Sequence, residues 1–138
     1  MVLFEPVDKL HIKVLEWWEI VDRHELLRLV HSMLVHPLGI DKVIVEAYKE
    51  AGFVKTWQPD VLYIIGTVDY LVRMHCGPGK FVNNTFAGTA RQWATPTKLN
   101  EYRTGDNPVG KGGHGHALMA LSHGLHWTAF QWEGPRTA

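Results

Sequence analysis

The sequence contains a single cysteine, Cys76, among 138 residues. One thiol cannot form a disulfide within the chain, so cysteine usage gives no indication of an oxidising compartment. There is no uncharged apolar run of roughly eighteen residues, and this predicts that no segment spans a membrane. The first residues, MVLFEPVDKL, lack the basic start and sustained apolar stretch of a secretory signal peptide. We therefore expect a cytoplasmic protein with no membrane partner.

An excess of charge of one sign is also missing. Residues 1–79 carry eight Lys/Arg and eleven Asp/Glu, a net of −3, and residues 80–138 carry six and three, a net of +3. Without a basic cluster the chain lacks the pattern typical of nucleic-acid-binding proteins, so no nucleic acid partner is expected. The hydrophobic fraction of 46% is that of a globular protein. The length predicts a single domain over 1–138.

The N-terminal part, residues 6–53, is predicted to form a layer of amphipathic helices. Apolar residues recur there every three or four positions, as on one face of a helix: Leu10, Val14, Trp17 or Trp18, and Val21. Asp22 and Glu25 have the spacing of a capping box and precede LLRLVHSMLV, which predicts a new helix after Asp22. Asp41 can cap a third helix, KVIVEAYKEA, which Gly52 would end.

The remainder, residues 60–133, is predicted to be a sheet and loop region. The stretch VLYIIGTVDYLVRMHC is rich in β-branched and aromatic residues and precedes Gly77-Pro78-Gly79, a strong turn signal. The simplest interpretation is a meander of three strands: 61–65, 68–76 and 80–86. A buried helix over 60–75 is the alternative, because the same apolar residues fit it.

The C-terminal third is expected to be rich in loops. Residues 94–113 contain many loop-forming residues, and loops of this length are often functional. After them, helix propensity favours a helix over 117–122 and alternation favours a strand over 125–132. The fold class we expect is α+β: N-terminal amphipathic helices packed on a small, mostly antiparallel sheet, with a loop-rich C-terminal third.

The segment 110–127, GKGGHGHALMALSHGLHW, holds four histidines and five glycines. Imidazole is a common zinc ligand, so these histidines form a candidate site for a divalent metal such as zinc: His114, His116, His123 and His126. The segment contains neither HExxH nor CxxC. The histidines of the N-terminal part share no simple spacing and are expected to be surface or helix-end residues rather than ligands: His11, His24, His31 and His36.

A second candidate is a nucleophile and base pair formed by Cys76 and His116, with His114 beside it. If residues 80–93 were helical, Cys76 would lie near the positive end of that helix, which favours a thiolate. A cysteine with a helix first and a histidine on a later strand resembles the papain-like cysteine hydrolases. The similarity rests on Cys76, Gly115, His116 and the apolar residues that follow. The turn-forming Gly-Pro-Gly and the short spacing depart from that family's pattern.

A third candidate is an anion site. Successive glycines around Gly113 can point backbone N–H groups inward, Lys111 adds a positive charge, and a helix starting near His116 would strengthen the site. Arg73 and Arg91 belong to a polar cluster that could also contact a small ligand.

These features predict a small enzyme, hydrolase- or lyase-like, with its site at residues 110–126. His116 would act as base or metal ligand, and Cys76 as nucleophile. Two alternatives stay open: a non-catalytic module that binds a small molecule or an anion, and a structural subunit of a homo-oligomer. Homo-oligomerisation is expected because Trp17 and Trp18 cannot both face one core, and exposed tryptophan is typical of interfaces.

Overall fold

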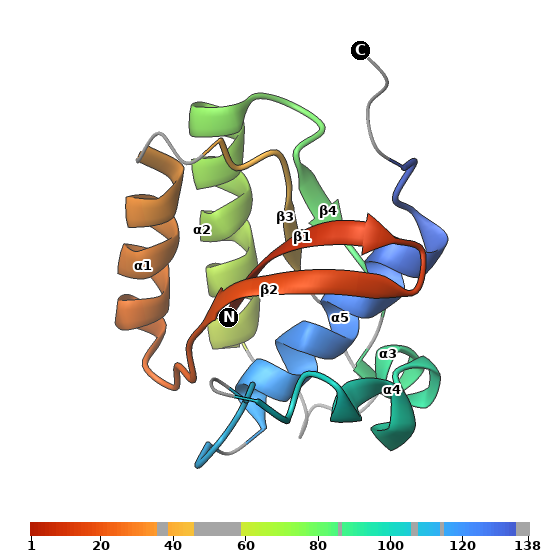
Figure 1. The fold of residues 1–138 in the computed structure, drawn as a ribbon. Helices are drawn as coiled ribbons and strands as arrows, with labels where there is room; N and C mark the ends of the chain where they lie inside the picture. Colours follow the sequence, from red (N-terminus) through yellow and green to blue (C-terminus); the bar gives the residue numbers. More distant parts are fainter. Residues whose placement is uncertain (36–38, 46–58, 86, 106–107, 114, 135–138) are drawn as a thin grey trace. The chain divides into compact units, whose positions relative to one another are not determined.

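In the computed structural model the chain forms two compact units, one made of residues 1–20 and 87–138 (unit 1) and one made of residues 21–86 (unit 2). The structure describes residues 1–35, 39–45, 59–85, 87–105, 108–113 and 115–134, and the two units are considered separately (Figure 1). Both units combine helices and strands, so the α+β class is confirmed. A single domain over 1–138 stays a prediction.

Unit 1 begins with an antiparallel hairpin of β1 (Val2–Asp8) and β2 (His11–Trp17). The predicted helix over this region is wrong. Side chains alternate along each strand, so Phe4 on β1 and Ile12 on β2 face the core. Leu10, which a helix would have buried, is 61% exposed. These residues form two strands rather than a helix because Asp8 accepts a hydrogen bond from the backbone N–H of Leu10 in a tight turn, which reverses the chain.

Helix α5 (His116–Phe130) packs on both strands of the hairpin. Ala117, Leu121 and Leu125 recur every four residues and are almost completely buried in the core of unit 1. Gly124 lets β1 approach closely, because a Cβ there would lie 3.0 Å from Cε1 of Phe4. The predicted strand over 125–132 is therefore wrong, because helix α5 continues to Phe130 and buries Leu125 and Trp127.

Two short helices, α3 (Ala87–Trp93) and α4 (Pro96–Asn100), complete unit 1. The predicted loop over 94–113 thus contains α4, which starts at a proline as helices often do. After α4 the backbone N–H of Val109 donates to the carbonyl oxygen of Tyr102 at 2.8 Å. This contact closes the segment on itself and places Val109 in the core.

Unit 2 contains α1 (Arg23–Val35) and α2 (Pro59–Cys76), which run side by side in the same direction (Figure 1). The predicted cap of α1 is confirmed: Asp22 Oδ1 accepts hydrogen bonds from the backbone N–H groups of His24 at 2.7 Å and Glu25 at 3.3 Å. Val68 and Val72, one turn apart on α2, are buried. Residues 61–76 are helical, so the predicted strands 61–65 and 68–76 are wrong and the alternative helix is confirmed. Within the predicted third strand, 80–86, residues 81–83 do form a strand.

A parallel pair of short strands, β3 (Val43–Val45) and β4 (Phe81–Asn83), lies in the same unit. The predicted third helix is wrong over 43–45, where the three β-branched residues VIV pair with β4 instead. The rest of that predicted helix lies outside the described residues. Among the described residues, the strands therefore form one antiparallel and one parallel pair.

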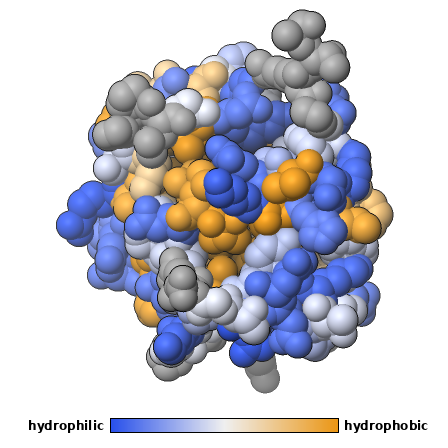
Figure 2. All heavy atoms as spheres, in the orientation of Figure 1, coloured by the Kyte–Doolittle hydropathy of each residue, from blue (hydrophilic) through white to orange (hydrophobic). Residues whose placement is uncertain are grey.

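Apolar side chains (orange) reach the surface among polar ones (blue) over the hairpin in Figure 2. On the hairpin, Val7 is 59% exposed and Leu15 is 44% exposed. In the part of the chain that the structure describes, no helix combines the length and apolar composition needed to cross a bilayer.

Candidate functional site

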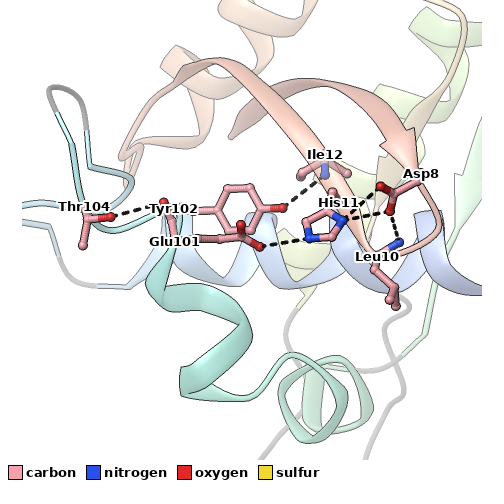
Figure 3. A network of polar contacts seen from close by, with 7 residues as sticks. All are labelled: Asp8, Leu10, His11, Ile12, Glu101, Tyr102 and Thr104. Atoms are coloured by element: carbon pink, nitrogen blue, oxygen red, sulfur yellow. Dashed lines mark hydrogen bonds and ion pairs between the residues drawn. The ribbon is translucent and has the colours of Figure 1, made fainter.

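A cluster of ionisable side chains lies at the turn of the hairpin in unit 1 (Figure 3). The Asp8 carboxylate accepts a hydrogen bond from the backbone N–H of Leu10 at 2.8 Å. Its two oxygens also lie 2.9 Å and 3.0 Å from Nδ1 of His11. Since a carboxylate only accepts hydrogen bonds, this contact places a proton on Nδ1 of His11. The other ring nitrogen, Nε2, is left as the atom available for chemistry.

Glu101, the residue after α4, lies on the Nε2 side of the same ring. Its Oε1 is 3.9 Å from Nε2 of His11. The next residue, Tyr102, joins this segment to the hairpin, because its hydroxyl accepts a hydrogen bond from the backbone N–H of Ile12 at 3.1 Å. The imidazole therefore lies between two carboxylates that come from distant parts of the chain.

These contacts shift the ionisation of the groups in opposite directions. The hydrogen bond with Asp8 and then its charge, helped by the charge of Glu101, raise the pKa of His11 above 6.5. The backbone hydrogen bond from Leu10, followed by the hydrogen bond with His11, lowers the pKa of Asp8 below 3.8. Burial raises the pKa of Tyr102 above 10.0, so its phenol keeps its proton at neutral pH.

The cluster is open to solvent. The side chains of Asp8, His11 and Glu101 are 57%, 51% and 54% exposed. Exposed ion pairs contribute little to the free energy of folding, so the fold does not depend on this contact. A carboxylate that orients a histidine whose second nitrogen is accessible is an arrangement suited to general acid–base catalysis.

The glycine-rich approach to α5 holds an internal carboxylate. Oε1 of Glu19 accepts a hydrogen bond from the backbone N–H of His116 at 2.7 Å, and Oε2 accepts one from Ala117 at 2.9 Å. A Cβ at Gly113 would lie 2.7 Å from Cδ of Glu19, so only glycine leaves room for this side chain. The positive end of α5 is thus neutralised from within the chain.

This observation bears on the predicted anion site at Lys111 and Gly113. The helix terminus and the glycines are suited to an anion, as expected, and Glu19 supplies one. An external anion would have to displace Glu19 from both N–H groups. Binding of a free anion by Lys111 and Gly113 stays a prediction.

The four histidines of the predicted metal site differ in their surroundings. His114 lies outside the described residues, His116 is exposed at the start of α5, and His123 is 4% exposed. Burial, and then the charge of His123, lower the pKa of His126, whose ring lies 4.7 Å from that of Phe130. Among the described residues, no three or more His, Cys, Asp or Glu side chains lie where they could share a metal ion. Zinc binding through these histidines stays a prediction.

Cys76 is the last residue of α2 in unit 2, and its thiol lies 3.9 Å from the carbonyl oxygen of Ile40. The predicted position near the start of a following helix is wrong, because residues 81–83 form β4. His116 belongs to unit 1, so the pair of Cys76 with His116 stays a prediction.

The two arginines proposed as ligand contacts belong to different units. On α2, Nε of Arg73 forms an ion pair with Oδ1 of Asp69 at 2.7 Å. The predicted strand 68–76, which includes Arg73, is part of helix α2 instead. Arg91 is exposed on α3. Ligand binding by either residue stays a prediction.

The sequence did contain a signal for the cluster at the hairpin turn. In DKLH, residues 8–11, an aspartate can bond the backbone two residues later and so form a tight turn. That signal was missed because the surrounding spacing was interpreted as helical. Glu101 had no local signal, because its approach to His11 depends on the tertiary fold.

Comparison of this chain with protein-family models, with curated proteins and with solved structures finds no match.

Proposed function

We propose that unit 1 is a small acid–base enzyme, hydrolase- or lyase-like, in which His11 is the general base. The observation that supports this proposal is the contact of both Asp8 oxygens with Nδ1 of His11, which leaves Nε2 accessible. The reaction class is the one expected from the sequence, and the residues that carry it are different.

The proposed chemistry follows from the two ring nitrogens. With its proton on Nδ1, neutral His11 can accept a second proton at Nε2 from water as the water oxygen attacks an ester carbonyl. The resulting imidazolium is stabilised by Asp8 and Glu101, and it can return the proton to the leaving oxygen. Because the accepting form is the neutral ring, the rate should rise as pH increases through the raised pKa of His11.

Hydrolysis of p-nitrophenyl acetate by the full chain tests the proposal. General acid–base catalysis by a positioned side chain contributes about 10²-fold or more. We therefore expect His11→Ala to lower kcat/KM by about 10²-fold. Asp8→Asn should lower the rate and move the pH profile to lower pH, because the positive shift of the His11 pKa is lost.

The matched control is His24→Ala, which removes an exposed histidine that lies in unit 2 instead of unit 1. It should leave the rate unchanged. If both alanine variants lose the same small fraction of the rate, the activity comes from surface imidazoles in general and the proposal is wrong.

The earlier alternatives stay proposals beside this one. His116, with His114, is a second candidate base or metal ligand for the segment 110–126. The non-catalytic module for a small molecule or anion predicts thermal stabilisation by ligand without turnover. The homo-oligomeric subunit predicts a defined oligomer, which sedimentation measures directly.

A further inference from the structure

Two histidines meet between the helices of unit 2. His31 on α1 and His75 on α2 have ring centroids 5.4 Å apart, with an angle of 65° between the ring planes. Both side chains are exposed, so a solute can reach the rings from solvent. The two residues belong to neither the cluster at His11 nor the segment 110–126.

The distance between the rings suits two imidazoles on one metal ion. With a metal–nitrogen bond of about 2.0–2.1 Å, each ring centroid lies about 3.2 Å from the ion. At a tetrahedral angle the two centroids are then about 5.2 Å apart. The observed 5.4 Å is close to that value and corresponds to a coordination angle slightly wider than tetrahedral.

The position on the helices favours a cation. His75 lies in the last turn of α2, and α1 runs beside α2 in the same direction (Figure 1). The C-terminal end of a helix carries a partial negative charge that stabilises positive charge nearby. The neighbouring arginine in that turn, Arg73, is paired with Asp69, which reduces its repulsion of a metal ion.

We propose that His31 and His75 form a two-histidine site for a late divalent transition metal, with water completing the coordination. Imidazole ligands prefer Cu²⁺, Ni²⁺ and Zn²⁺ to Mg²⁺ and Ca²⁺, which select oxygen ligands. The ion would bridge α1 and α2, which pack against each other in unit 2. Because the site is formed in the folded unit, metal binding stabilises it against unfolding.

Calorimetric titration of the full chain with ZnCl₂, in buffer free of chelators, measures the binding. We expect the parent chain to bind zinc at this site, and His31→Ala and His75→Ala each to weaken the affinity of that site for zinc at least tenfold. His24→Ala removes an exposed histidine near the start of α1 and should bind zinc as the parent chain does. MgCl₂ should give no binding heat.

Ring signals in the nuclear magnetic resonance spectrum give a second, independent measurement. Substoichiometric NiCl₂ should broaden the ring signals of His31 and His75 before those of His11 or His116. If zinc binds equally well to the parent chain and both alanine variants, or if the first signals to broaden belong to the segment 110–126, the inference is overturned. Absence of any zinc binding by the parent chain overturns it as well.

Discussion

The carboxylate of Glu19 is expected to be a major local contribution to the stability of unit 1. It accepts two backbone hydrogen bonds at the first residues of α5, of 2.7 Å and 2.9 Å, and lies at the positive end of that helix. Removal of a helix cap costs about 0.5–2 kcal/mol, and loss of the favourable helix-dipole interaction adds about 0.3–1 kcal/mol. The N–H of His116 is exposed and regains water, whereas that of Ala117 is partly buried and does so less well.

From these magnitudes, Glu19→Ala should lower the free energy of unfolding by about 1–3 kcal/mol. Glu19→Gln keeps the shape and one acceptor oxygen but removes the charge, so it should cost about 1 kcal/mol. Glu16→Gln is the control, since Glu16 is an exposed glutamate on β2 in the same unit. Five of the six tryptophans lie in unit 1, so urea unfolding followed by tryptophan fluorescence reports mainly on this unit.

Glu19 lies so close to Gly113 that a Cβ at residue 113 would be 2.7 Å from its Cδ, so the two positions should be energetically coupled. Gly113→Ala forces Glu19 to move and should weaken the same two hydrogen bonds. Its cost should therefore be much smaller in the Glu19→Ala background than in the parent chain. A cost of Glu19→Ala below about 0.5 kcal/mol, or full additivity with Gly113→Ala, would refute the role assigned to Glu19.

Three further predictions concern unit 1. Leu121→Ala removes a fully buried side chain from α5 and should lower the free energy of unfolding by about 2.7–5 kcal/mol, measured by urea denaturation. Gly124→Ala should destabilise despite its better helix propensity, because the new Cβ meets Phe4 at 3.0 Å; increased stability would contradict this contact. The pairing raises the His11 pKa, so its stabilisation is present below pH 6.5 and is lost as pH rises through the folded pKa. Titration of the ring by nuclear magnetic resonance should give a pKa above 6.5, and Asp8→Asn should return it toward that value.

Local signals in the sequence predicted some elements well. Asp22 before an apolar run gave the start of α1 because capping depends on neighbouring residues alone. The helix terminus after Gly113, where the sequence predicts an external anion, holds the carboxylate of Glu19; binding of an external anion stays a prediction. The sequence could not reveal that the carboxylate is Glu19, because the two lie almost a hundred residues apart.

Elements whose periodicity was ambiguous were predicted less well. Residues 61–76 are apolar enough for a strand or a helix, and burial of Val68 and Val72 one turn apart selects the helix. The hairpin was missed because Leu10 and Val21 completed a helical spacing although both are exposed. Proximity of His31 to His75, and of His11 to Glu101, is a tertiary property that single-residue patterns do not encode.

Unit 1 is interrupted in sequence, and this has a consequence during protein synthesis. Its hairpin leaves the ribosome first, but α5, against which Phe4 and Ile12 pack, is translated only after all of unit 2. Chains emerge at about 5–20 residues per second, so the apolar side of the hairpin waits for several seconds without its helix. Unit 2 is complete by residue 86 and can fold during that interval. The newly made chain therefore carries an unsatisfied hairpin until residues 116–130 have been translated, and we expect a chaperone that holds nascent chains to bind there.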